Sequence, residues 1–172
     1  MKTKQLLSVF LLAFTLTSFN VFSQEKNIVE VAVSSDAHTT LVAAVKAADL
    51  VGVLTSEGPF TVFAPTNDAF SKLPAGTVET LLKPENISKL QAILKYHVVS
   101  GNFMASDVVA LINKNNGMAT IPTVNGSSLT AMIKDGSVFL KDVNGNMSKI
   151  SATDLKASNG VIHVIDSVVL PK

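Results

Sequence analysis

The 172-residue chain contains no cysteine, no tryptophan and no arginine, and its 14 basic residues are all lysines. Without cysteine, the chain can form no disulfide and cannot carry the lipid-modified cysteine of a bacterial lipoprotein. Without arginine, it lacks the planar group that grips phosphate in two places, and without tryptophan it lacks the best platform for stacked bases. The 14 lysines are balanced by 13 acidic residues. We therefore expect no nucleic-acid partner.

The first 23 residues have the pattern of an export signal. Lys2 and Lys4 form a positively charged start, residues 6–14 form an apolar core, and Val21 and Ser23 suit the positions before a cleavage site. An uncleaved membrane anchor is the less favoured alternative, because the apolar core is short for a bilayer crossing. We expect cleavage after Ser23 and a secreted or periplasmic product that does not span the membrane.

The remaining 149 residues form one domain of ordinary size, which needs no disulfides to fold. They hold 12 lysines and 13 acidic residues, so their net charge is −1. We expect a signal peptide over residues 1–23, a disordered start over 24–27 and a monomeric domain over 28–172.

The hydrophobic pattern changes along the chain from a helical to a strand period. Its clearest helix follows Pro84, where Ile87, Leu90, Leu94 and His97 recur on one face. Strands are expected from residue 118 onward, because apolar runs alternate there with turn dipeptides. Helices followed by strands indicate an α+β fold. The turn dipeptides are Asn125-Gly126, Asp135-Gly136, Asn144-Gly145 and Asn159-Gly160.

Two segments carry the most specific pattern of the chain. In residues 61–70 (TVFAPTNDAF), a short buried strand ends at Pro65, and Thr66 is placed to cap the helix that follows, with Asp68 in its first turn. In residues 160–171 (GVIHVIDSVVLP), a long and nearly all-apolar strand follows a turn. These segments resemble the two signature segments of the fasciclin domain family, and Tyr96-His97 resembles its Tyr-His motif.

The resemblance covers residues 28–172 and implies both a fold and a function. The implied fold is α+β, with N-terminal helices packed on a mostly antiparallel β wedge or sandwich. The implied function is non-catalytic cell adhesion, through contact with a cell-surface or extracellular-matrix protein or glycan.

Four residues are adhesion candidates through this resemblance, and the first two are Tyr96 and His97. His97 lies on the apolar face of its helix, so we favour a core histidine whose ring nitrogens bind neighbouring backbone groups. Tyr96 points about 100° away from that face. We expect it either to cover an edge of the core or to expose the tip of its phenol to solvent and take a direct part in adhesion.

The other two adhesion candidates are Asp154 and Leu155, which align with the Asp-Ile pair that serves integrin recognition in animal matrix proteins of the family. Leucine here replaces isoleucine. We favour a structural alternative, in which Asp154 caps a turn and Leu155 fills the core beneath it.

Catalytic and metal-binding patterns are missing from the chain. His163 and Asp166 are three residues apart on a predicted strand, so they project from opposite faces and form no dyad. Asp142 begins a calcium-like loop, but Met147 stands where the loop needs glycine and Thr153 where it needs glutamate, so a hairpin turn is preferred. We expect no catalytic residue, no metal and no cofactor.

Two alternative functions remain open. A mean hydropathy of +0.39 permits a carrier that shelters a small apolar ligand between the helices and the strand layer. A well-packed core has the same composition, however. An enzyme with a dispersed active site is the second alternative.

Overall fold

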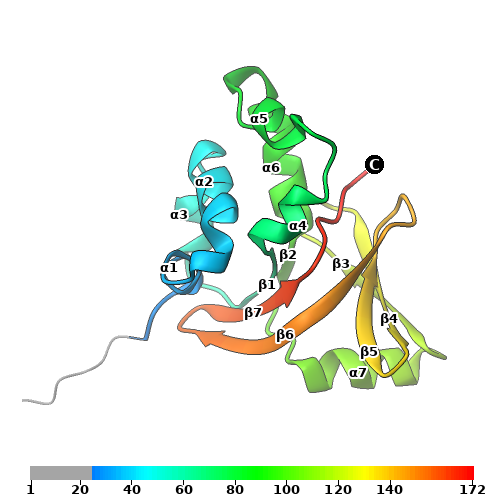
Figure 1. Cartoon of the computed structure of the whole chain (residues 1–172). Coiled ribbons are helices and arrows are strands. Elements are labelled where there is room, and N and C mark those ends of the chain that lie inside the picture. The colour runs from blue at the N-terminus through cyan, green and yellow to red at the C-terminus, as the bar shows by residue number, and fades with distance from the viewer. Residues whose placement is uncertain (1–24) are drawn as a thin grey trace, which may run out of the picture.

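The computed structural model describes residues 25–172, and the signal peptide and cleavage point predicted for residues 1–23 lie outside this range (Figure 1). Seven α-helices and two 3₁₀ turns occupy mainly the first two thirds of the described chain. Their bounds are α1 Ile28–Val33, η1 Asp36–His38, α2 Thr39–Ala47, α3 Val51–Leu54, α4 Asn67–Ser71, α5 Thr77–Leu81, η2 Pro84–Asn86, α6 Ile87–Tyr96 and α7 Ala105–Lys114. None of these helices is both long enough and apolar enough to cross a bilayer.

Short polar side chains fix where several helices begin. The Thr66 hydroxyl accepts a hydrogen bond from the Ala69 amide at 3.2 Å, so the cap predicted for α4 is confirmed. Asn27 caps α1, and the Lys26 carbonyl accepts a hydrogen bond from the Ser158 amide.

The seven strands form one continuous sheet in the order β2-β1-β7-β6-β5-β4-β3. Neighbouring strands are antiparallel except for β1 and β7, which run parallel. Three of the four predicted turn dipeptides lie between two consecutive strands, and Asn159-Gly160 leads from the turn into β7, whose first residue is Gly160. The strands are β1 Phe60–Pro65, β2 Val98–Ser100, β3 Met118–Pro122, β4 Ser128–Lys134, β5 Ser137–Lys141, β6 Met147–Ala157 and β7 Gly160–Ile165.

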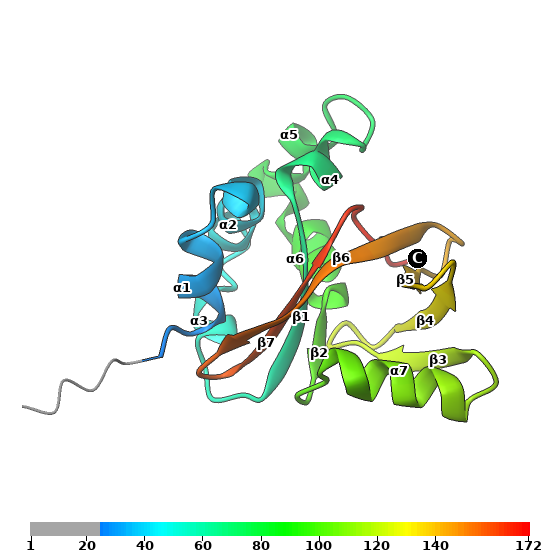
Figure 2. The ribbon, with the colours of Figure 1, turned by 60° about the horizontal axis from the view of Figure 1, so that its bottom comes forward.

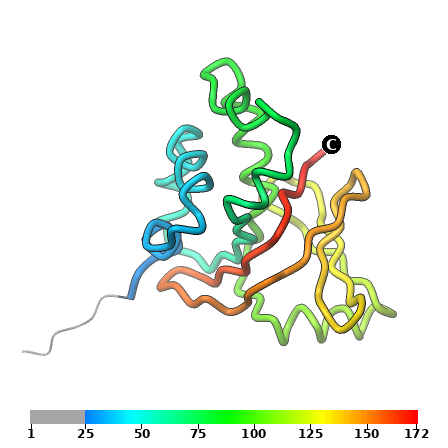
Figure 3. Tube along the Cα trace, in the orientation of Figure 1, coloured from blue at the N-terminus to red at the C-terminus, as the bar shows by residue number. Residues whose placement is uncertain are grey.

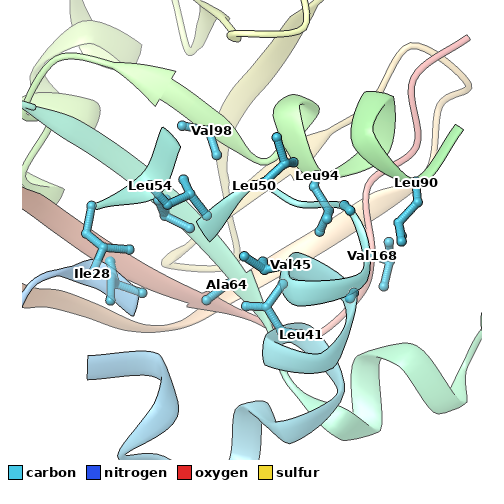
Figure 4. Close-up of a cluster of buried hydrophobic side chains, with 14 of the residues drawn as sticks. Ile28, Leu41, Val45, Leu50, Leu54, Ala64, Leu90, Leu94, Val98 and Val168 are labelled. Atoms are coloured by element: carbon cyan, nitrogen blue, oxygen red, sulfur yellow. The ribbon is translucent and has the colours of Figure 1, made fainter. Parts of the chain in front are cut away.

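Strand β7 lies between β1 and β6 and is covered on both faces. On one face, Ile162 joins a cluster that also holds residues of α1, α2, α4 and α6. Figure 4 shows part of this cluster, with Ile28, Val45 and Leu94 gathered near Ala64 of β1. On the other face, Ile165 joins a second cluster formed with α7 and the strands β3–β5.

The two clusters divide the molecule into a helical part and a strand part. Figures 2 and 3 show the helices α1–α6 on one side of β1 and β7, and the strands β3–β5 with α7 on the other. The α+β arrangement of N-terminal helices on a mostly antiparallel β wedge is therefore confirmed.

Candidate interaction site

His97 ends helix α6 and lies in the core, 2% exposed. Its Nδ1 lies 2.8 Å from the Ile93 carbonyl, and its Nε2 accepts a hydrogen bond from the Val169 amide at 3.2 Å. A carbonyl only accepts and an amide only donates, so the neutral ring carries its proton on Nδ1. Burial lowers the pKa of His97 to about 4, although the hydrogen bond to Ile93 acts in the opposite direction. The expectation of a core histidine bonded to backbone is confirmed.

Tyr96 is also fully buried, at 0% exposed, so the alternative of a solvent-exposed phenol is wrong. Its hydroxyl donates to the Ser128 carbonyl at 2.9 Å and accepts from the Val143 amide at 3.3 Å. Burial raises the pKa of Tyr96, whereas the Val143 amide lowers it. Tyr96 thus joins α6 to β4 and to the β5–β6 turn, and it cannot touch a partner directly.

His163 on β7 holds three segments together from inside the fold. Its Nδ1 accepts a hydrogen bond from the Asp154 amide at 3.3 Å, so its Nε2 carries the proton and donates to the Phe103 carbonyl at 2.7 Å. The ring also stacks on Phe63, with centroids 5.7 Å apart. Asp166 instead binds the Lys149 amide, 2.9 Å away. His163 is therefore packed, and it forms no dyad with Asp166, as expected.

Asp154 combines a rare backbone conformation with a capping contact. Its φ of 59° lies in the left-handed region, which Asp and Asn tolerate better than most side chains. Its carboxylate accepts a hydrogen bond from the Ala105 amide at 2.8 Å, in the first turn of α7. The predicted capping role is present, but it serves a helix 49 residues away instead of a local turn.

Leu155 lies on the surface, 40% exposed, so our expectation that it fills the core is wrong. The pairing of β6 with β7 shifts register between Ile150 and Ala152 and again between Ala152 and Leu155. Such irregularities re-aim side chains at the end of a sheet. Leu155 is consequently exposed on β6, directly after the residue that caps α7.

A groove runs along α7, the helix that Asp154 caps. Its volume is about 510 Å³, and its lining includes Asn102, Phe103, Asp107, Leu111 and Lys114. The sequence analysis missed Phe103 and Asn102. No local sequence pattern identifies these two residues. The groove depends on the hydrogen bond between His163 of β7 and the Phe103 carbonyl, and these residues are 60 positions apart in the chain. Leu155 and Asp154, together with this groove, form the candidate interaction site.

The remaining carboxylate singled out by the sequence, Asp142, is structural. It is 4% exposed, and it accepts hydrogen bonds from the Asn144 and Asn146 amides, from the Asn146 side chain and from the Leu170 amide. It thus organises the β5–β6 turn that was preferred over a calcium loop. Within residues 25–172, no three His, Asp or Glu side chains gather in a group suited to a metal ion.

The space between the helices and the strands holds a small apolar cavity of about 40 Å³. Its walls come from α1, α2, α3, α6, β1 and β7, and they include Ile28, Val45, Leu54, His97 and Ile162. The cavity lies where the carrier alternative requires one. Its volume is far below the roughly 300–1,000 Å³ of typical ligand pockets.

Comparisons with known proteins agree with this architecture. The model of the Fasciclin domain family matches residues 36–171. Protein sll1483 of Synechocystis sp. is 54% identical over 144 residues, which cover 84% of this chain and 73% of that protein. The transforming growth factor-beta-induced protein ig-h3 of Sus scrofa is 36% identical over 76% of this chain, but over only 17% of its own length.

The structure is also similar to a solved FAS1 domain pair from the insect cell adhesion molecule Fasciclin I. The TM-score is 0.73 at 20% identity, and the match covers 86% of this chain and 51% of the insect chain. This likeness concerns the fold, and the family match rests on the sequence. The chain belongs to the fasciclin domain family.

Proposed function

We propose that this protein is an exported, non-catalytic adhesion domain that acts as a monomer and binds a protein or glycan of a cell surface or extracellular matrix. The observation that carries the proposal is the exposed Leu155 on β6, which directly follows Asp154, the residue that caps α7. A fixed apolar side chain in a polar surround is typical of an interface anchor. The occurrence of the same fold in an insect cell adhesion molecule supports an adhesive role.

Tyr96 and His97 contribute to this proposal from inside the fold. Both are buried, and their hydrogen bonds join α6 to β4, to the β5–β6 turn and to the segment after β7. They keep the domain rigid, and a rigid scaffold loses little freedom when a partner binds. The contact surface itself consists of Asp154, Leu155 and the groove along α7.

The test is to crosslink the protein to intact cells of its source and to identify what is captured. Leu155→Ser removes the apolar anchor and should weaken capture at least tenfold, a typical loss for a central interface residue. The matched control is Val53→Ser, because Val53 is similarly exposed, at 47%, on α3. Equal capture by both variants, at unchanged melting temperatures, would contradict the proposed site.

A carrier of a small apolar ligand is the second candidate, favoured by the cavity between the helices and the strands. Because the cavity holds about 40 Å³, a carrier has to move α1 and α2 away from β1 to admit a ligand. Native mass spectrometry of protein purified from its source distinguishes the two candidates. A bound small molecule supports the carrier, and a bare chain supports adhesion.

A further inference from the structure

The outer face of the strands β3–β6 gathers most of the methionine in the described chain. Three of the four methionines in residues 25–172 lie on it. Met118 is directly opposite Met132, and Met132 is opposite Phe139, so these three form an apolar row across three strands. Met147 on β6 lies in the next row. Met118 is 56% exposed and Met147 is 37% exposed. We call this surface the methionine face.

The methionine face is the side of the sheet that α7 does not cover. The residues that alternate with it, among them Ala131 and Leu140, point into the second core cluster together with Ile112 of α7. Figures 1 and 2 show β4 and β5 at the rim of the molecule, with α7 alongside β3. Met118 and Met147 are therefore presented to the surroundings, whereas Met132 and Phe139 are half-buried between their neighbours on this face.

Exposed lysines frame this face. Lys149 is opposite Phe139 and therefore stands at the end of the apolar row. Lys141 is opposite Met147, and Lys134 is the last residue of β4. No lysine of this frame forms an ion pair within the described residues. The face is thus apolar at its centre and positively charged at its margin.

Carboxylates near the margin do not neutralise this charge in full. Asp135 is exposed in the β4–β5 turn beside Lys134. Asp142 is buried and bonded to four donors. Asp166 is paired with Lys72 at 3.4 Å. A partner that meets this face therefore encounters lysine charge around methionine and phenylalanine side chains.

This combination fits some partner chemistries better than others. Protein interfaces are depleted in lysine, so a folded protein partner is disfavoured. A glycan needs many hydrogen-bonding groups, and the described face offers mainly hydroxyls such as those of Thr120 and Thr130. Flexible methionine side chains adapt to an irregular partner, and lysine stems lie along apolar surfaces while their charges reach anionic headgroups. A lipid surface offers an apolar layer for the methionine side chains and anionic headgroups for the lysines.

We propose that the methionine face docks the protein peripherally on an anionic lipid bilayer, with Met118, Met132 and Phe139 at the acyl boundary and the three lysines on the headgroups. This surface is separate from Leu155 and the groove along α7. Lipid binding by the methionine face and adhesion through Leu155 and the groove can therefore be tested independently of each other.

The first test measures binding of the exported protein to vesicles of phosphatidylglycerol and phosphatidylcholine in equal parts, with vesicles of phosphatidylcholine alone for comparison. Each lysine near an anionic surface contributes about fivefold in affinity. The triple variant Lys134→Gln/Lys141→Gln/Lys149→Gln should therefore bind the anionic vesicles roughly a hundredfold more weakly. Added salt should weaken wild-type binding.

The matched control is Lys46→Gln/Lys83→Gln/Lys89→Gln, which removes the same charge from exposed positions in the helical part of the molecule, with Lys46 on α2, Lys89 on α6 and Lys83 between α5 and η2. All variants carry the same amino terminus, so the difference between the two triple variants reports the face itself. Equal loss in both variants would mean that only net charge matters, and this result would overturn the proposal. Leu155→Ser should retain vesicle binding.

A second test reports insertion directly, because the chain has no tryptophan. Met118→Trp places a single reporter on the face, and its fluorescence should shift to shorter wavelength with anionic vesicles. Val53→Trp on α3 should show no shift. The proposal is overturned if the wild type fails to bind the anionic vesicles, or if the two introduced tryptophans stay equally exposed to solvent. It is also overturned if the wild-type protein is retained on a column of acidic polysaccharide but does not bind the vesicles.

Discussion

Acidification from pH 7 to pH 5 should lower the free energy of unfolding by about 2 kcal/mol through the buried imidazole of His97 alone. The ring is neutral in the fold, where its Nε2 accepts the Val169 amide and its Nδ1 donates to the Ile93 carbonyl. If Nε2 were protonated, its N–H would point at the N–H of Val169 inside the core, and neither donor would have an acceptor. The folded state therefore resists the proton that the unfolded chain accepts.

The magnitude follows from the two pKa values. Burial lowers the pKa of His97 from 6.5 to about 4 in the fold. Between these values the unfolded chain binds more protons, so stability is highest above pH 6.5 and is lost as the pH falls through 4. The full loss is about 3 kcal/mol, and about 2 kcal/mol of it appears by pH 5.

The assay is urea unfolding at pH 7 and pH 5 for the wild type and for His97→Asn. Asparagine does not titrate, and its amide can still donate to the Ile93 carbonyl, but the Val169 amide loses its acceptor. The variant should be about 2 kcal/mol less stable at pH 7, from the unpaired amide and the lost packing. This deficit should nearly vanish at pH 5.

The comparison between wild type and variant is needed because other groups also titrate. Burial lowers the pKa of His38 as well, and this group is present in both proteins. A deficit that is the same at pH 7 and pH 5 would refute the reasoning. A nuclear magnetic resonance titration that places the His97 pKa near 6.5 in the folded protein would refute it too.

Three further predictions concern stability in urea. Tyr96→Phe should cost about 1–3 kcal/mol, because it leaves two buried backbone groups without their partner. Asp142→Ala removes the acceptor of four hydrogen bonds and should cost about 3 kcal/mol or more, whereas Asp135→Asn in an exposed turn keeps a residue suited to its left-handed backbone and should change stability by less than about 0.5 kcal/mol. Gly160→Ala should yield little folded protein, because its Cβ would lie 2.0 Å from a backbone oxygen, whereas Gly52→Ala meets nothing within 4 Å and should keep or slightly raise stability.

Features that depend on neighbours in sequence were predictable. The Thr66 cap acts over three residues, and each Gly-containing turn dipeptide sets its own backbone geometry. The two apolar faces of β7 likewise follow from alternation within one strand. The α+β class follows from the change of hydrophobic period.

Features that depend on contacts with elements distant in the sequence were not predictable from these local patterns. Helical periodicity places Tyr96 away from the main apolar face of α6, but it does not show that β4 and the β5–β6 turn cover that side as well. For Leu155, alternation along β6 fails because the strand is irregular on either side of Ala152.

The parallel contact of β1 with β7 has a consequence for biosynthesis. Phe60 pairs with Gly160, so the centre of the sheet joins segments that are synthesised one hundred residues apart. Pairings between such distant segments form slowly, since a long loop has to close before they contribute. The nascent chain consequently cannot complete its fold until its last strand has left the ribosome. If the chain is exported unfolded, as we propose, this delay keeps it competent for translocation.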